Sequence, residues 1–181
     1  MISDSDSYAA LILKANGVIA HYTDTIIGLA CLPKEKLLQR LVRIKHRPNT
    51  KAFIMLASFS EQIAEFTQCS SAELSKLDLP QPTPTTWLVE SSSMCPPFLI
   101  GESKKIAVRI TRHAGIQSIC NQVGPIVSTS ANLSDQTICT DLKQVRNMFG
   151  PAIDYLHWTK NTGTGRPSAV IDLKSGKILR E

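Results

Sequence analysis

The stretch PIVSTSAN (125–132) joins an apolar run to a cluster of small polar residues. The apolar run predicts a buried strand that ends in a turn, and three hydroxyl groups and one carboxamide follow within residues 128–132. Hydroxyl and backbone N–H groups at such a turn can bind phosphate oxygens or metal-bound water. A polar turn without a ligand is an open alternative. The lack of a G-x-S-x-G elbow around these serines argues against a hydrolase nucleophile.

Around this stretch, strand patterns alternate with helix patterns. Helices are predicted at 8–15, 34–45, 114–124 and 141–150, and strands at 17–22, 53–57, 85–90 and 105–110. A second apolar run covers 26–32, where Gly28 predicts a close approach of the backbone or a bulge. This alternation predicts an α/β fold with a mixed parallel and antiparallel sheet and flanking helices.

Further expectations concern the ends of elements. Ser58 with Glu61, and Ser70 with Glu73, have the capping-box spacing that opens a helix. Thr140 is expected to cap the helix over 141–150. The short runs IDYLHW, SAVIDL and GKILR close the chain as strands, and we expect antiparallel additions at one edge of the sheet.

The segment RIKHRPNTKAF (43–53) concentrates positive charge after a predicted helix. Pro48 disfavours helical geometry at Arg47, so residues 45–51 are expected to form a loop. Lys45, Arg47 and Lys51, together with His46, suit the binding of phosphate or carboxylate oxygens. A solvated basic patch that counters the dipole of the helix C-terminus is the alternative.

Composition limits the class of protein. The 181 residues predict one domain over 1–181, because domains commonly contain about 150 residues. The formal net charge of +5 favours anionic partners such as nucleic acid, nucleotides or phosphates. Five cysteines without a C-x-x-C pair predict reduced, mostly buried thiols. The N-terminus lacks the basic start of a signal peptide, and no apolar run approaches the roughly 18 residues that span a membrane, so we expect a cytoplasmic protein without a membrane partner.

Other candidate motifs are weaker. NTGTGRPS (161–168) matches neither standard phosphate loop, and either a loop that closes over a ligand or a plain connection fits it. The histidines lack metal-ligand spacing; His113 is expected to start a helix, and structural roles are favoured for all except His46. The chain shows no convincing pair of carboxylates for acid–base work. A reaction that depends on charge neutralisation, such as phosphoryl or nucleotidyl transfer, suits this composition.

Taken in order, several segments resemble the YrdC-like threonylcarbamoyl-AMP synthase family in its short, single-domain form. The segments that carry the resemblance are GVIAHYTDTIIGLACLP (17–33), IKHRPNTKAFIML (44–56), IAVRITRH (106–113), PIVSTSANLSD (125–135), RPSAVIDL (166–173) and GKILRE (176–181). The family fold is a twisted α/β sheet around a basic cavity. The sequence departs from the family pattern at Tyr22, Ala52, Gln81, Thr83 and Asp135, which concerns the shape of the pocket wall.

The resemblance implies an ATP-dependent nucleotidyltransferase. Its reaction joins L-threonine, bicarbonate and ATP into threonylcarbamoyl-adenylate and releases pyrophosphate, with Mg²⁺ as the metal. A tRNA-modifying transferase complex then uses the adenylate for adenosine 37 of ANN-decoding tRNAs, and tRNA or double-stranded RNA is a possible further partner. The alternative function is a non-catalytic RNA-binding protein that uses the same basic groove.

The resemblance also implies roles for individual residues, with no protein ligand to a metal among them. The catalytic residues would be Lys45, Arg47, Ser130 and Asn132. ATP would be bound by Lys45, Arg47, Lys51, Ser130, Asn132 and Arg180. Threonine would be bound by Thr23, Arg109, Ser128 and Ser168.

Overall fold

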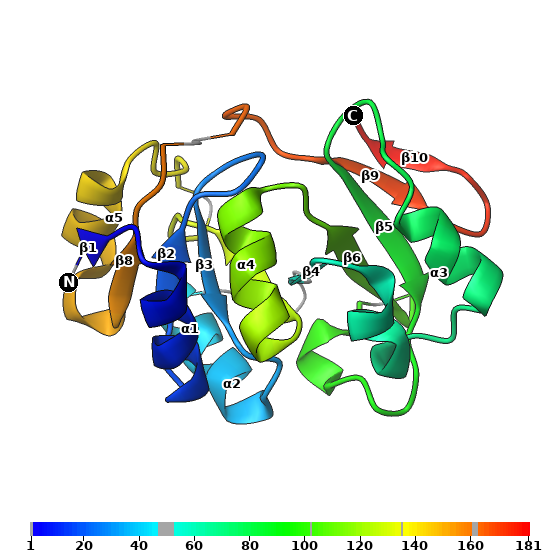
Figure 1. Ribbon diagram of the computed structural model, residues 1–181, viewed down its shortest axis with the longest axis horizontal. Coiled ribbons are helices and arrows are strands. Elements are labelled where there is room, and N and C mark those ends of the chain that lie inside the picture. Colours follow the sequence, from blue (N-terminus) through cyan, green and yellow to red (C-terminus); the bar gives the residue numbers. More distant parts are fainter. Residues whose placement is uncertain (1, 47–52, 102, 135, 161–162) are drawn as a thin grey trace.

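A ten-stranded mixed sheet organises the computed structural model of the chain (Figure 1). The structure describes residues 2–46, 53–101, 103–134, 136–160 and 163–181. The strands are β1 (Ile2–Ser3), β2 (Ile19–His21), β3 (Gly28–Cys31), β4 (Ile54–Ala57), β5 (Thr85–Glu90), β6 (Lys105–Ile110), β7 (Ile126–Ser130), β8 (Tyr155–His157), β9 (Ala169–Asp172) and β10 (Ile178–Arg180). The α-helices are α1 (Asp6–Lys14), α2 (Glu35–Lys45), α3 (Ser71–Leu77), α4 (Ala114–Val123) and α5 (Leu142–Phe149). Short 3₁₀ helices cover Ser60–Phe66, Pro97–Leu99 and Gly150–Ala152.

Parallel and antiparallel pairs both occur in the sheet, which confirms the predicted fold class. Its strands follow the order β1–β8–β2–β3–β7–β4–β6–β5–β9–β10. β3 pairs in antiparallel fashion with β2 and β7, and β7 pairs in antiparallel fashion with β4. β4 pairs in parallel with β6. The PIVSTSAN stretch therefore supplies a central strand, as its apolar run predicts.

Amphipathic helices cover the sheet and close the core. Leu37, Leu38 and Leu41 are buried on α2, which contacts β3, whereas Arg43 on the same helix is exposed. α1 and α4 pack side by side; α1 also contacts β2 and β8, and α4 contacts β4 (Figure 1). These contacts bury the apolar faces that the helical spacing predicts.

The placement predicted for the C-terminal strands is wrong in part. β8 pairs in parallel with β1 and β2 near one end of the sheet. β9 pairs in parallel with β5 near the other end, and only β10 adds in antiparallel fashion, to β9. The connection between β8 and β9 is long enough to cross the sheet, so strands that are close in sequence lie far apart (Figure 1).

Two of the expected helix caps are also wrong. The helix that follows Ser58 is a 3₁₀ helix over Ser60–Phe66, and its cap, Phe59, makes no side-chain cap hydrogen bond. Asp141 rather than Thr140 caps α5, because the Asp141 carboxylate accepts from the Gln144 N–H at 2.8 Å. The capping box at Ser70 and Glu73 and the start of α4 at His113 are confirmed.

The five cysteine thiols are unpaired, as expected, and four of them are buried. Burial raises the pKa of Cys31 and of Cys120 to about 12, which leaves both thiols protonated and unreactive near neutral pH. In the described part of the chain, no helix has the length and apolar character needed to cross a lipid bilayer.

Candidate functional site

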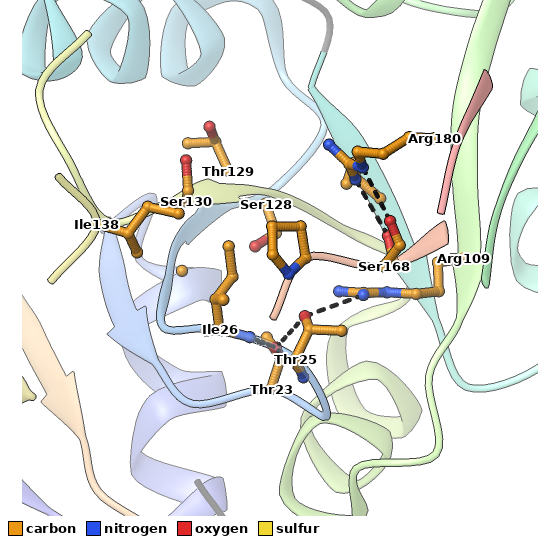
Figure 2. Close-up of a pocket in the computed structure, with 13 residues that line it drawn as sticks. Thr23, Thr25, Ile26, Arg109, Ser128, Thr129, Ser130, Ile138, Ser168 and Arg180 are labelled. Carbon is orange, nitrogen blue, oxygen red and sulfur yellow. Dashed lines mark hydrogen bonds between the residues drawn. The ribbon is translucent and has the colours of Figure 1, made fainter. Parts of the chain in front are cut away.

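A cavity of about 200 Å³ opens where stretches distant in sequence converge (Figure 2). The turn after β2 forms one side, strands β6 and β7 form others, and the segments around β9 and β10 complete it. Six residues predicted for binding line this cavity: Thr23, Arg109, Ser128, Ser130, Ser168 and Arg180. The remaining lining residues that the structure describes are Thr25, Ile26, Gly28, Ile54, Thr129, Ile138 and Pro167.

Lys45 fixes the turn that follows β7. Its side chain is only 1% exposed, and its ammonium donates to Asn132 O at 2.6 Å, to Asn132 Oδ1 at 3.1 Å and to the carbonyl of Ser130. The Ser130 hydroxyl donates to the same Asn132 Oδ1 at 2.7 Å. The basic segment and the small polar cluster thus meet at Lys45, although neither Lys45 nor Asn132 is among the residues that line the cavity. Arg47, Lys51 and Ala52, like Asp135, lie outside the described residues.

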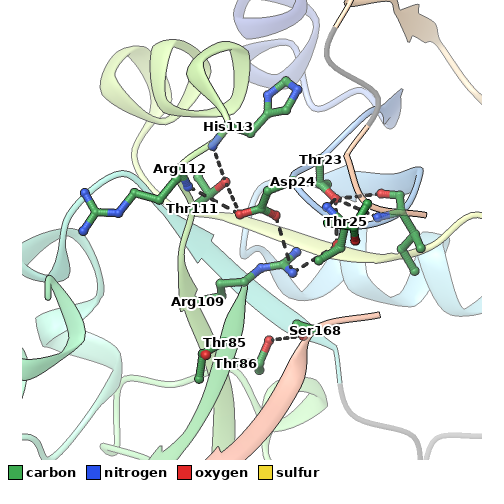
Figure 3. Close-up of polar contacts among 12 residues, drawn as sticks. Thr23, Asp24, Thr25, Thr85, Thr86, Arg109, Thr111, Arg112, His113 and Ser168 are labelled. Atoms are coloured by element: carbon green, nitrogen blue, oxygen red, sulfur yellow. Dashed lines mark hydrogen bonds and ion pairs between the residues drawn. The ribbon is translucent and has the colours of Figure 1, made fainter. Parts of the chain in front are cut away.

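Arg109 points into the cavity from β6 with only part of its guanidinium engaged (Figure 3). Its NH1 donates to Thr25 Oγ1 at 3.1 Å and lies 3.6 Å from the carboxylate of Asp24. In the part of the chain that the structure describes, Arg109 Nε has no hydrogen-bond partner, although the residue is only 5% exposed. A buried donor without a partner costs free energy, so this atom favours a ligand that brings an acceptor.

The Thr23–Thr25 turn holds the groups that surround Arg109. Thr23 Oγ1 donates to Ile26 O at 2.7 Å and accepts from the N–H groups of Thr25 and Ile26. Asp24 Oδ2 accepts from the Arg112 N–H at 3.4 Å, which ties the turn to the end of β6. Thr23 lines the cavity, but its hydroxyl is engaged within the turn.

Ser168 and Arg180 form the opposite wall. Ser168 Oγ lies 2.7 Å from Thr86 Oγ1 on β5, which places the start of β9 (Figure 3). Arg180 Nε donates to Ser168 O at 2.9 Å (Figure 2). The C-terminal strand therefore delivers a second guanidinium to the cavity.

The two arginines give the cavity its electrostatic character. Burial lowers the pKa of Arg109, an effect that the nearby Asp24 carboxylate opposes, and burial lowers the pKa of Arg180. A guanidinium keeps its proton under such shifts, so both side chains remain cationic; Arg109 is nearly buried, whereas Arg180 is exposed. No carboxylate occurs among the described lining residues. The arrangement suits an anionic ligand.

A strap formed by residues 163–168 is hydrogen-bonded to the Thr23–Thr25 turn, and its Pro167 and Ser168 line the cavity. The Thr164 N–H donates to Asp24 O at 3.3 Å, and the Gly165 N–H donates to Thr25 O at 2.8 Å. Beyond Thr25 and the strap lies a second cavity of about 500 Å³, which Thr25, Ile26 and Ile138 also line. The sequence left open whether NTGTGRPS contacts a site; its described part does.

Several of these contacts are not predictable from the sequence. Thr25 and Asp24 belong to the quoted segment 17–33, but nothing in that segment indicates that their side chains face an arginine from a distant strand. His21, assigned a structural role, lies within 3.1 Å of Ser128 Oγ. Gln81 and Thr83, which depart from the family pattern, line a separate cavity that also includes Asp24.

The family model Sua5/YciO/YrdC, described as "Telomere recombination", matches residues 11–181. The chain belongs to this family. That membership confirms the resemblance seen in the sequence.

Two members of the Sua5/YciO/YrdC family illustrate the similarity. A threonylcarbamoyl-AMP synthase of Thiobacillus denitrificans is 37% identical over 171 residues, which cover 93% of this chain and 90% of that protein. A protein of the same name from Vibrio vulnificus (strain YJ016) is 33% identical over 174 residues, covering 93% of this chain and 94% of the relative.

Solved structures of the family share the fold. P. abyssi Sua5 complexed with L-threonine matches with a TM-score of 0.85 and 25% identity over 96% of this chain. This chain spans about half of that protein, 52% of its length. E. coli YciO matches over 100% of this chain and 93% of its own, with a TM-score of 0.80 and 20% identity, which shows the fold alone.

The burial of His21 predicts acid-sensitive stability. Burial lowers the pKa of His21 from 6.5 to about 3, and the charges of His157, His113 and Arg109 act in the same direction. Below pH 6.5 the unfolded chain gains a proton that folded His21 does not accept, so stability falls as pH falls toward about 3. Between pH 6.5 and about 5, the free energy of unfolding should fall by on the order of 2 kcal/mol. Urea unfolding at the two pH values measures this change. Equal stability at both pH values would contradict this account.

Because the strap lies close to the Thr23–Thr25 turn, replacing its two glycines by alanine should destabilise the fold by different amounts. Gly163 and Gly165 have similar φ angles of 70° and 71°, but only at Gly163 would an added β-carbon lie 2.4 Å from Thr23 O. Gly165→Ala should lower the free energy of unfolding by about 1–2 kcal/mol, because alanine is strained in this left-handed backbone conformation. Gly163→Ala should lower the free energy of unfolding by at least about 1 kcal/mol more, because the added β-carbon also displaces the strap from the turn. Equal costs in chemical unfolding would show that the strap is not seated there.

Proposed function

We propose that this chain is a threonylcarbamoyl-AMP synthase, which converts L-threonine, bicarbonate and ATP into threonylcarbamoyl-adenylate and pyrophosphate. The observation that carries the proposal is the unpartnered Nε of Arg109 in a cavity that also holds Arg180 and the serines of β7. The names of the relatives support the same reaction.

L-threonine would bind through its carboxylate to Arg109. Thr25 and Asp24 hold NH1 of the guanidinium, whereas Nε has no partner among the described residues, so the carboxylate would complete the hydrogen bonding of a buried cation. Ser128 and Ser168 line the same cavity and would contact the rest of the amino acid. Fixing the carboxylate orients the amine for reaction with bicarbonate.

ATP would extend from the turn after β7 toward the second cavity. The first cavity, at about 200 Å³, lies below the ~300–1,000 Å³ usual for ligand pockets, whereas the adjoining cavity adds about 500 Å³. Ser130 and Asn132 would face the phosphates, and the Lys45 ammonium beside them adds positive charge. Arg180 would act at the nucleotide, and Arg47 and Lys51 remain predicted members of this phosphate site.

The residues present fit Mg²⁺ only as a companion of the ATP phosphates. Mg²⁺ prefers oxygen ligands and keeps several waters. Ser130 Oγ offers such an oxygen, whereas Asn132 Oδ1 already accepts from Lys45 and Ser130. The described residues contain no cluster of His, Cys, Asp or Glu that would hold a metal. When bound with ATP, the ion would neutralise charge on the departing pyrophosphate.

Chemically, the threonine amine adds to bicarbonate to give a carbamate with loss of water. The carbamate oxygen attacks the α-phosphorus of ATP, and the bond to pyrophosphate breaks. Two anions must approach each other, and fixed guanidinium groups in a partly dry cavity reduce their repulsion. A tRNA-modifying transferase complex would then transfer the threonylcarbamoyl group to adenosine 37 of ANN-decoding tRNAs.

The direct test measures pyrophosphate released from ATP, bicarbonate and L-threonine with Mg²⁺. Release should require all three substrates. Lys45→Ala should lower the rate by on the order of a hundredfold, because it removes a cation and loosens the turn carrying Ser130 and Asn132. Arg43→Ala removes an exposed cation of the same helix and should leave the rate unchanged.

Two results would contradict this proposal. One is a folded protein that releases no pyrophosphate under any metal condition. The other is RNA binding that falls steeply with salt while ATP neither competes nor is consumed, which would favour the non-catalytic alternative.

A further inference from the structure

A histidine that the proposed reaction does not use reaches across the sheet to the cavity wall. His21 lies on β2, Ser128 lies on β7, and β3 runs between them. His21 Nε2 is nevertheless 3.1 Å from Ser128 Oγ. Neighbouring strands are about 4.8 Å apart, so the imidazole must cover the width of the intervening strand.

Gly28 on β3 makes that contact possible. It pairs with His21 on one side and with Ser130 on the other, so it lies on the path between the two side chains. A β-carbon at Gly28 would lie 2.7 Å from Ser128 Oγ and 3.2 Å from His21 Nε2. The sequence predicted a close approach at this glycine, and the structure shows side chains rather than a bulge as the reason.

The hydrogen bonds determine which atom carries each proton. His21 Nδ1 lies 3.1 Å from Tyr22 O, and a carbonyl only accepts, so Nδ1 carries the proton of the neutral ring. Nε2 must then accept, which means that the Ser128 hydroxyl donates to it. The hydrogen of Ser128 points away from the cavity, and the oxygen lone pairs remain available to a ligand.

This pair resembles the serine–histidine arrangement of a hydrolase only in its distance. His21 is completely buried, and burial lowers its pKa to about 3. An imidazole of that kind is a weak base and does not remove a proton from serine near neutral pH. Its remaining effect is to fix the direction of the Ser128 hydroxyl.

We propose that His21 is a positioning residue that turns Ser128 into a hydrogen-bond acceptor for the amino group of the substrate. The inference rests on the proposed function, since it takes L-threonine as the ligand whose carboxylate binds Arg109. Ser128 and Arg109 line the same cavity, so one amino acid can contact both. The pair thereby selects ligands that carry an amine beside the carboxylate.

The test compares the binding of L-threonine with that of 3-hydroxybutanoate, which keeps the carboxylate and hydroxyl but lacks the amine. His21→Asn retains a donor near Nδ1 for Tyr22 O and removes the acceptor at Nε2. In calorimetric titration it should weaken L-threonine binding about tenfold and leave 3-hydroxybutanoate unchanged. Ser128→Ala should have the same effect on both ligands. The double variant should bind L-threonine no more weakly than Ser128→Ala does, because both changes remove the same interaction.

Two further variants separate positioning from a structural role. His21→Gln places a carboxamide oxygen near Nε2 and should restore much of the L-threonine affinity. His157→Asn changes the buried histidine that pairs with His21 in the β2–β8 register, and it should leave both affinities unchanged. Thermal unfolding of each variant checks that it is folded. If His21→Asn does not fold, Ser128→Ala still decides, since unchanged L-threonine binding by that variant overturns the inference.

The outcomes distinguish the two proposals. A wild-type protein that does not bind L-threonine overturns both. A wild-type protein that binds L-threonine, with His21→Asn binding it equally well, overturns only the role of His21. Equal weakening of both ligands would also overturn it, because a structural defect would then explain the loss.

Discussion

The buried ammonium of Lys45 is the interaction on which the geometry of the site depends. A lysine removed from water is costly unless its donors are satisfied, and here oxygens of Ser130 and Asn132 accept from it. The contact joins the C-terminus of α2 to the turn after β7. It therefore fixes the small polar turn relative to the helix, and with it the wall on which Ser128 and Ser130 lie.

Arg109 and Arg180 face that wall from the other half of the sheet. Arg109 is nearly buried and the ion pair with Asp24 compensates it incompletely, whereas Arg180 is exposed. A cavity that already contains a desolvated guanidinium favours an anion, because the cost of desolvating that cation is met during folding. The hydroxyl of Ser128, held by His21, adds an acceptor to a site otherwise dominated by donors.

The sequence predicted the local elements of this arrangement better than their partners. Hydrophobic spacing predicts α2, and the change from apolar to small polar residues predicts β7 and its turn. The same patterns do not indicate which strands pair. That is why β8 and β9 were expected at one edge, although β8 pairs with β2 and β9 with β5.

For the site residues, too, the sequence predicts individual positions better than the contacts between them. The resemblance to the family identified Arg109, Ser130 and Ser168, and the structure brings them to one cavity. It did not identify Thr25, and it gave no reason for a glycine between His21 and Ser128, because both features depend on register across three strands. Local sequence rules describe neighbours along the chain, whereas these contacts exist only once the sheet has formed.

We propose that one site holds threonine at Arg109 and the ATP phosphates beside the turn fixed by Lys45. A crystal structure with L-threonine and a non-hydrolysable ATP analogue would show where both ligands bind. We predict the threonine carboxylate on Arg109 Nε and the triphosphate next to Ser130 and Asn132. Threonine bound away from Arg109, or a triphosphate remote from that turn, would contradict the account.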